Sequence, residues 1–222
     1  MSIKVKARCW VVLLAVLGMS SPAGAFVIIH EVLSDPPAGL AGDANGDQVG
    51  SSSQDEFVEL FNGGAAAVDL SGWTLADNTK VRHIFPEGSL ILPNSVFVIF
   101  GGGSPVFDSF SWQVASSGGL GLNNTGDFLL LADAYGIMVD YMEYGPEANA
   151  DQSLTRFPEG SPSAGFIQHT KLPGAESLRF SPGYLVTSSD RNAVIPEPLS
   201  IWGLSLGLMS AAVIRRKRAR EF

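Results

Sequence analysis

The chain has 222 residues, 45% of them hydrophobic and 16% charged, and its formal net charge is −8 at pH 7. The charge is uneven, because residues 26–195 hold 6 lysines and arginines against 20 acidic residues, a net charge of −14. Affinity for nucleic acid and for anionic lipid depends on lysine and arginine at phosphates, so this composition argues against both partners. Cations and neutral glycans are better matched to such a region.

Residues 1–25 have the three parts of a secretory signal peptide. Three basic residues precede an apolar stretch over residues 9–19, and small residues follow as far as Ala25. We predict cleavage between Ala25 and Phe26 by signal peptidase after export through the Sec machinery. The apolar stretch is too short for a membrane helix. Cys9 is the only cysteine, so the mature chain would have neither a disulfide nor a thiolate site.

The region after the signal peptide is predicted to be all-β. Strand-like runs occupy Val27 to Leu33, Phe57 to Phe61, Val68 to Leu75, Val81 to Phe85, Leu90 to Phe100, Phe128 to Ala132 and Ile137 to Tyr144. Residues that favour turns separate these runs. In the second run Val58 and Leu60 alternate with Glu59, as expected for a half-buried strand. Short strands separated by turns favour a β-sandwich over a parallel α/β fold.

A long insertion between Asp35 and Asp55 interrupts the regular spacing of the strands. Its oxygen-bearing residues, with the two acids that follow it, form a candidate calcium site made of Asp43, Asn45, Asp47, Asp55 and Glu56. Oxygen ligands at alternate positions are how a calcium loop surrounds a hard cation. The EF-hand pattern is not met, because its sixth position is Gln48 and its twelfth is Gln54. The alternative is a solvated loop whose Asp, Asn and Gly residues suit turns.

Catalytic signals are weak throughout the chain. His30, His83 and His169 are too widely spaced for a zinc-binding pair and are interpreted as structural or surface residues. Residues 26–195 contain no GxSxG elbow and no phosphate-binding loop. Trp73 follows Gly72 and is interpreted as a core residue in preference to a platform for sugars.

Several segments together resemble the lamin tail domain. They include Asp55-Glu56-Phe57-Val58-Glu59-Leu60-Phe61-Asn62, then Val68-Asp69-Leu70-Ser71-Gly72-Trp73-Thr74-Leu75, and later Leu120-Gly121-Leu122-Asn123-Asn124-Thr125-Gly126-Asp127. The resemblance covers most of residues 26–183 and implies an immunoglobulin-like β-sandwich. The family supplies no catalytic residues to carry over. Its fold alone does not fix a function.

The last 27 residues resemble the PEP-CTERM sorting signal of Gram-negative bacteria. Pro196-Glu197-Pro198 is followed by an apolar run from Leu199 to Ile214, and then by the basic residues Arg215, Arg216, Lys217, Arg218 and Arg220. The apolar run is just long enough to span a bilayer, and the basic residues would stay on the cytoplasmic side. The resemblance implies transient anchoring in the inner membrane and cleavage near the tripeptide by an exosortase. An uncleaved tail-anchored protein is the alternative.

These observations predict a signal peptide (1–25), an all-β immunoglobulin-like sandwich (26–183), a linker (184–195) and a transmembrane sorting helix within residues 196–222. We expect a non-enzymatic binding or structural module, possessing no cofactor other than a calcium ion. The protein would be exported across the inner membrane to the cell surface or extracellular matrix, where exopolysaccharide or another matrix protein is the expected partner. A secreted hydrolase, or an accessory to one, is the alternative function.

Overall fold

The structure is a computed structural model that describes residues 26–186. The predicted signal peptide, the sorting signal and all but the first residues of the predicted linker lie outside the described residues. Within residues 26–186, no helix has both the length and the apolar character needed to cross a membrane.

The described chain is built from β-strands joined by loops and three short 3₁₀ turns, as the sequence predicts. The strands are β1 (Val27–Leu33), β2 (Phe57–Asn62), β3 (Val68–Asp69), β4 (Thr74–Ala76), β5 (Val81–Ile84), β6 (Leu90–Ile91), β7 (Ser95–Phe100), β8 (Ser111–Val114), β9 (Asp127–Ala132), β10 (Met138–Tyr144), β11 (Leu154–Phe157) and β12 (Gly165–Gln168). The 3₁₀ turns are η1 (Gly39–Gly42), η2 (Pro146–Ala148) and η3 (His169–Lys171).

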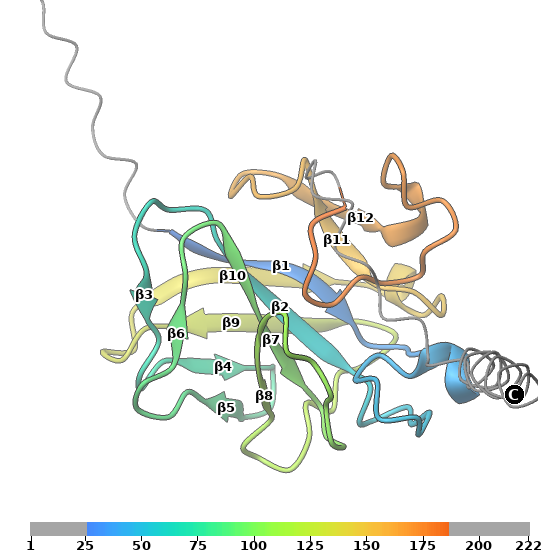
Figure 1. Ribbon diagram of the computed structural model, residues 1–222, viewed down its shortest axis with the longest axis horizontal. Helices are drawn as coiled ribbons and strands as arrows, with labels where there is room; N and C mark the ends of the chain where they lie inside the picture. Colours follow the sequence, from blue (N-terminus) through green and yellow to red (C-terminus); the bar gives the residue numbers. More distant parts are fainter. Residues whose placement is uncertain (1–25, 187–222) are drawn as a thin grey trace, which may run out of the picture. The chain divides into compact units, whose positions relative to one another are not determined.

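The strands form two main sheets and one small ribbon (Figure 1). The larger sheet has the order β12-β11-β1-β2-β7-β8, and the smaller one has the order β10-β9-β4-β5. Strands β3 and β6 form the ribbon. All neighbours are antiparallel except β7 and β8. This predominantly antiparallel, all-β arrangement agrees with the predicted sandwich.

Apolar residues from both sheets form the main core. Ile29 of β1 and Leu60 of β2 belong to the same buried cluster as Leu75 of β4 and Leu131 of β9. Burying such side chains is worth roughly 1.5–3 kcal/mol each. Trp73 packs against this cluster but is only partly buried, so its interpretation as a core residue holds for only part of the indole.

The outer face of the larger sheet is also buried, which the sequence did not predict. The expected alternation in β2 is present, because Val58 and Leu60 belong to the main core and Glu59 does not. The expectation that β2 is only half-buried is wrong, however, since all six of its residues are buried and Glu59 has no exposed surface. Residues after β10 return beside β1 as β11 and β12 (Figure 1), and the segment that follows them bonds to Glu59.

Two predicted strands are each divided. Val68 to Leu75 contains β3, a turn and β4, because Gly72 adopts a positive φ of 77° and Trp73 N–H donates to Leu70 O at 2.9 Å. Leu90 to Phe100 likewise separates into β6 and β7, with Asn94 at a φ of 51° between them. Strands β8 and β11 were not predicted. Strand β12 contains the apolar pair Phe166 and Ile167 but was also absent from the predicted strand runs.

Candidate functional site

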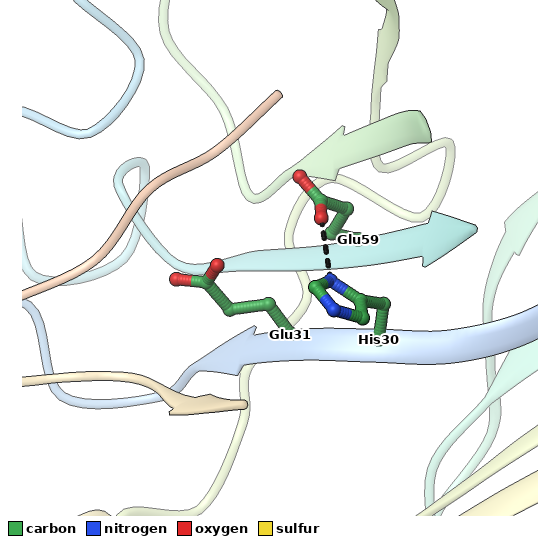
Figure 2. A group of neighbouring side chains, drawn as sticks. All are labelled: His30, Glu31 and Glu59. Atoms are coloured by element: carbon green, nitrogen blue, oxygen red, sulfur yellow. Dashed lines mark hydrogen bonds and ion pairs between the residues drawn. The ribbon is translucent and has the colours of Figure 1, made fainter. Parts of the chain in front are cut away.

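A group of buried polar side chains lies where β1 carries a β-bulge. Ile29 of β1 pairs with Leu60 of β2. The next pair in the ladder joins Glu31 to Glu59, so His30 is the extra residue of the bulge. In a regular strand His30 and Glu31 would point to opposite faces. The bulge instead brings both side chains to the same side as Glu59 (Figure 2).

Arg156 of β11 and Asp140 of β10 hold the bulge in place. Arg156 Nε donates to the carbonyl of Ile29 at 2.9 Å, and Ile29 N–H donates to Asp140 Oδ2 at 2.7 Å. The two side chains are themselves paired, since Arg156 Nη2 lies 2.8 Å from Asp140 Oδ2. The guanidinium also lies 4.6 Å from the centre of the Phe166 ring. These contacts satisfy the backbone groups that the bulge removes from the ladder.

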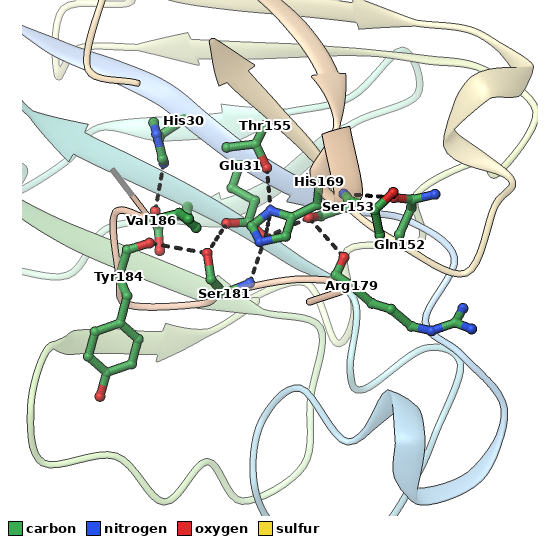
Figure 3. A network of polar contacts seen from close by, with 12 residues as sticks. His30, Glu31, Gln152, Ser153, Thr155, His169, Arg179, Ser181, Tyr184 and Val186 are labelled. Atoms are coloured by element: carbon green, nitrogen blue, oxygen red, sulfur yellow. Dashed lines mark hydrogen bonds and ion pairs between the residues drawn. The ribbon is translucent and has the colours of Figure 1, made fainter. Parts of the chain in front are cut away.

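Glu31 is the centre of a buried hydrogen-bond network (Figure 3). Its Oε1 accepts from Ser153 Oγ at 2.6 Å and from Ser181 N–H at 2.9 Å, and its Oε2 accepts from Ser181 Oγ at 3.0 Å. His169 Nδ1 lies 3.5 Å from Glu31 Oε1 and 2.8 Å from Thr155 Oγ1. We call His30, Glu31, Glu59, Glu159 and His169 the histidine–glutamate cluster.

The cluster binds the last described segment of the chain, residues 181–186, which we call the C-terminal strap. Gly183 N–H donates to Glu59 Oε2 at 2.6 Å, and Val186 N–H donates to Glu159 Oε1 at 2.9 Å. With the two bonds from Ser181 to Glu31, three carboxylates hold three positions of the strap. Hydrogen bonds to charged groups are worth about 1.5–3 kcal/mol each. The strap is therefore an integral part of the sandwich.

Burial and charge set the protonation of the pair at the centre of the cluster. His30 Nδ1 lies 2.8 Å from Glu59 Oε1, and neither side chain has exposed surface. Burial opposes a charged imidazole, but the hydrogen bond and negative charge of Glu59, with the charges of Glu31 and Glu159, raise the pKa of His30. Loss of hydration raises the pKa of Glu59, although His30 opposes that shift. Both pKa values are raised, so the His30–Glu59 pair binds a proton more tightly than the isolated side chains do.

The same residues resemble a metal-ligand set in composition. Among residues 26–186, the one group of three histidine or acidic side chains with ligand atoms within 4.8 Å of one another is His30, Glu31 and Glu59. All four of their carboxylate oxygens already accept hydrogen bonds from the protein. His30 Nε2 has no hydrogen bond within the described chain, but lies 3.7 Å from Glu159 Oε1. The arrangement suits a closed polar network better than an open metal centre.

The predicted calcium loop, residues 36–54, together with the two acids that follow it, Asp55 and Glu56, is here called the acidic loop. Four of its five predicted ligands lie together, because Asn45 N–H donates to Asp55 Oδ1 at 3.1 Å and Asp47 N–H donates to Asn45 Oδ1 at 3.0 Å. The negative charge of Asp43 also acts on Asp55. Burial is the main cause that raises the pKa of Asp55, and the negative charge of Asp43 adds a smaller increase.

Gln48, the sixth residue of the EF-hand pattern counted from Asp43, adopts the backbone conformation that an EF-hand loop reserves for glycine. Its φ is 67°, and its N–H donates to Asp43 Oδ2 at 2.8 Å. The loop thus makes the sharp turn of an EF-hand loop with glutamine in place of the usual glycine. Asp43 Oδ1 is buried and has no hydrogen-bond partner within residues 26–186.

Glu56, the fifth predicted ligand, lies apart from this group. Its Oε2 accepts from the N–H groups of Gly121 and Leu122 at 2.7 and 3.3 Å. Burial raises its pKa to about 7, against the opposing effect of these donors and of Arg82. Glu56 therefore fixes the loop before β9.

The remaining sequence candidates are held by the fold or lie outside the described residues. His83 is buried, with Nε2 at 2.7 Å from Gln113 Oε1, and burial lowers its pKa. Phe26 packs beside Gly63, whereas Ala25 is outside the described residues. The predicted exosortase and membrane-topology residues, from Pro196 to Arg220, are also outside them.

The two packed sheets define an all-β, immunoglobulin-like fold. A family model for the lamin tail domain matches residues 20–146. This is more than half of the chain, so the protein belongs to the lamin tail domain family. A comparison with curated proteins found no match. Strands β11 and β12 and the strap lie beyond the matched span.

Proposed function

We propose that the protein is an exported, non-enzymatic binding or structural module of the bacterial envelope or exopolysaccharide matrix. In this proposal the Sec machinery exports the chain and residues 1–25 are removed. An exosortase then recognises Pro196-Glu197-Pro198 while the following apolar run lies in the inner membrane. The product is displayed at the cell surface or in the matrix.

The observation that carries the non-enzymatic part is the burial of all three histidines. His30 and His169 have no exposed surface and His83 is 2% exposed. Histidine is the side chain best suited to acid–base catalysis near neutral pH, and a catalytic group must come within hydrogen-bond reach of its substrate. Membership of a family of binding and structural domains supports the same proposal.

Calcium binding by the acidic loop is part of the proposal. Asp43, Asn45, Asp47 and Asp55 supply oxygen ligands, and the unpartnered Asp43 Oδ1 supports an additional ligand role for that carboxylate. Glu56 contributes by holding the end of the loop. Calcium takes 6–8 oxygen ligands, so backbone carbonyls and water would complete the shell.

The proposal is tested by following the full chain in a bacterium that has an exosortase. We expect a product in the surface and matrix fractions whose mass lacks residues 1–25 and the segment after the tripeptide. Replacing Pro196, Glu197 and Pro198 together by alanine should leave the chain in the inner membrane. Retention of the unaltered chain in the cytoplasm would contradict export. Hydrolytic turnover that a histidine substitution abolishes would contradict a non-enzymatic role.

A further inference from the structure

A cavity of about 540 Å³ lies between the beginnings of β1 and β10, beside the β3–β6 ribbon. Its walls include Val68, Trp73, Val139 and Pro162, and two carboxylates, Asp133 and Asp140, complete the polar part of its lining. The volume is within the range of small-molecule sites, which are roughly 300–1,000 Å³. Figure 1 shows β3 and the first residues of β1 and β10 at the same end of the sandwich.

Trp73 is brought to this cavity by the turn before β4. Gly72 has a φ of 77°, and a Cβ there would lie only 3.2 Å from Ala134 Cβ. Glycine at this position therefore allows the β9–β10 turn to approach Trp73 closely. The indole packs against the core and also lines the cavity. It presents an apolar aromatic surface with a hydrogen-bond donor.

Each carboxylate is fixed through one oxygen. Asp133 Oδ1 accepts from the N–H groups of Tyr135 and Ile137, both at 2.9 Å. Asp140 Oδ2 accepts from Ile29 N–H and from Arg156. The other oxygens, Asp133 Oδ2 and Asp140 Oδ1, accept no hydrogen bond from the described residues and are not among their buried unpartnered atoms. Two oriented acceptors therefore remain accessible.

We propose that this cavity binds the sugar rings of a neutral polysaccharide. The C–H faces of a sugar ring match Trp73 and the aliphatic walls, and its hydroxyl groups donate to Asp133 and Asp140. Anionic polymers are disfavoured, since no lysine or arginine lines the cavity. The ion pair with Arg156 compensates the charge of Asp140, which reduces the demand for a cationic ligand. The inference rests on the proposed matrix function and names its ligand class.

The test is calorimetric titration of the full chain, in a detergent without a sugar headgroup, with hexasaccharides of glucose, mannose and galactose. We expect at least one to bind. Asp133→Asn keeps the Oδ1 acceptor for the turn but replaces the accessible oxygen by a donor, and it should weaken binding at least about tenfold. Val139→Trp fills the cavity from a side chain that is 37% exposed, and it should abolish binding.

Matched controls are Asp108→Asn, which makes the same charge change on an exposed residue outside the cavity, and Val106→Trp, at a side chain that is 62% exposed. Both should bind as the unaltered chain does, and melting curves identify any variant that is unfolded. The inference is overturned if none of the hexasaccharides binds, if only cationic or anionic polymers bind, or if Asp133→Asn binds normally. If the protein is found in the matrix but binds no sugar, this inference is overturned and the proposed function is not. If the chain binds sugar but is never exported, the proposed function is overturned and this inference is not.

Discussion

The acidic loop and the histidine–glutamate cluster both gather carboxylates, but they satisfy them differently. In the loop, oxygens of Asp43 and Asp47 accept N–H groups close in sequence, such as those of Gln48 and Val49. In the cluster, Glu31 accepts from Ser181, which lies 150 residues away. The loop carboxylates are thus held mainly by neighbours in sequence, with one longer-range bond from Ser104 N–H to Asp47 Oδ2, whereas the buried cluster joins the two ends of the domain.

The carboxylates of the cluster and those of the loop therefore have different roles. A buried charge without a partner is strongly destabilising, so the cluster must remain complete for the domain to fold. The acidic loop includes an unpartnered Asp43 Oδ1 and exposed neighbours. We therefore interpret the cluster as stabilising the fold, and we propose that the acidic loop is the region that binds calcium.

The largest effect is expected from removing a carboxylate of the cluster. Glu59→Ala leaves a buried His30 imidazole and the Gly183 N–H without their acceptor, and should lower the free energy of unfolding by about 3–5 kcal/mol. Asp47→Ala in the acidic loop removes acceptors near the surface and should cost about 1 kcal/mol. Urea denaturation of the full chain measures both. Equal losses of unfolding free energy in the two variants would contradict the distinction between the histidine–glutamate cluster and the acidic loop.

A smaller effect should come from displacing the strap. Gly183 has a φ of 92°, and a Cβ there would lie 2.2 Å from the Phe110 ring. Gly183→Ala should therefore cost about 2–4 kcal/mol from backbone strain and overpacking. Gly88→Ala is the control, because Gly88 has a similar φ of 82° but no atom within 4 Å of the added Cβ. If both variants melt alike, the strap contact is not important for stability.

Near neutral pH, the stability of the domain should decrease as pH rises. The pKa values of His30, Glu59 and Asp55 are raised, and that of Glu56 is raised to about 7. Groups with raised folded-state pKa values bind protons more tightly when folded. Their contribution is fully present below their unfolded-state pKa values and is lost as pH rises through the folded-state values.

We therefore expect the melting temperature to fall by a few degrees between pH 6 and pH 8. The lowered pKa of His83 acts in the opposite direction, since its contribution is present above the unfolded-state pKa and is lost as pH falls through the lower folded-state pKa. Glu56→Gln should reduce the pH dependence, because it removes one of the groups that titrate near 7. A melting temperature that rises from pH 6 to pH 8 would contradict this account.

The sequence predicted the sandwich and most of its strands because alternation and turn residues are local signals. Phe57 to Phe61 and Phe128 to Ala132 both form strands close to their predicted bounds. The sequence also predicted that Asp43, Asn45, Asp47 and Asp55 lie close together. They do in the structure, because all four belong to a single loop. Their proposed ion is a separate prediction that geometry alone does not test.

The histidine–glutamate cluster was not predicted, for two physical reasons. A β-bulge has no reliable sequence signal, and without the bulge neighbours such as His30 and Glu31 would point to opposite faces of a strand. The strap that buries Glu59 comes from a Pro-, Gly- and Ser-rich region with weak strand signals, and its contacts span more than 120 residues. The presence of three histidines in an acidic chain was a usable clue, but their burial depends on this long-range packing.

The proposed division between a closed cluster and a calcium-binding loop is tested most directly by melting the full chain with calcium and with a chelator. A ligand that binds only the folded state must raise the melting temperature as its concentration increases. We predict a calcium-dependent rise that Asp43→Ala abolishes and that Asp108→Ala, an exposed control outside the loop, retains. No rise in the unaltered chain, or an equal rise in Asp43→Ala, would contradict calcium binding by the acidic loop.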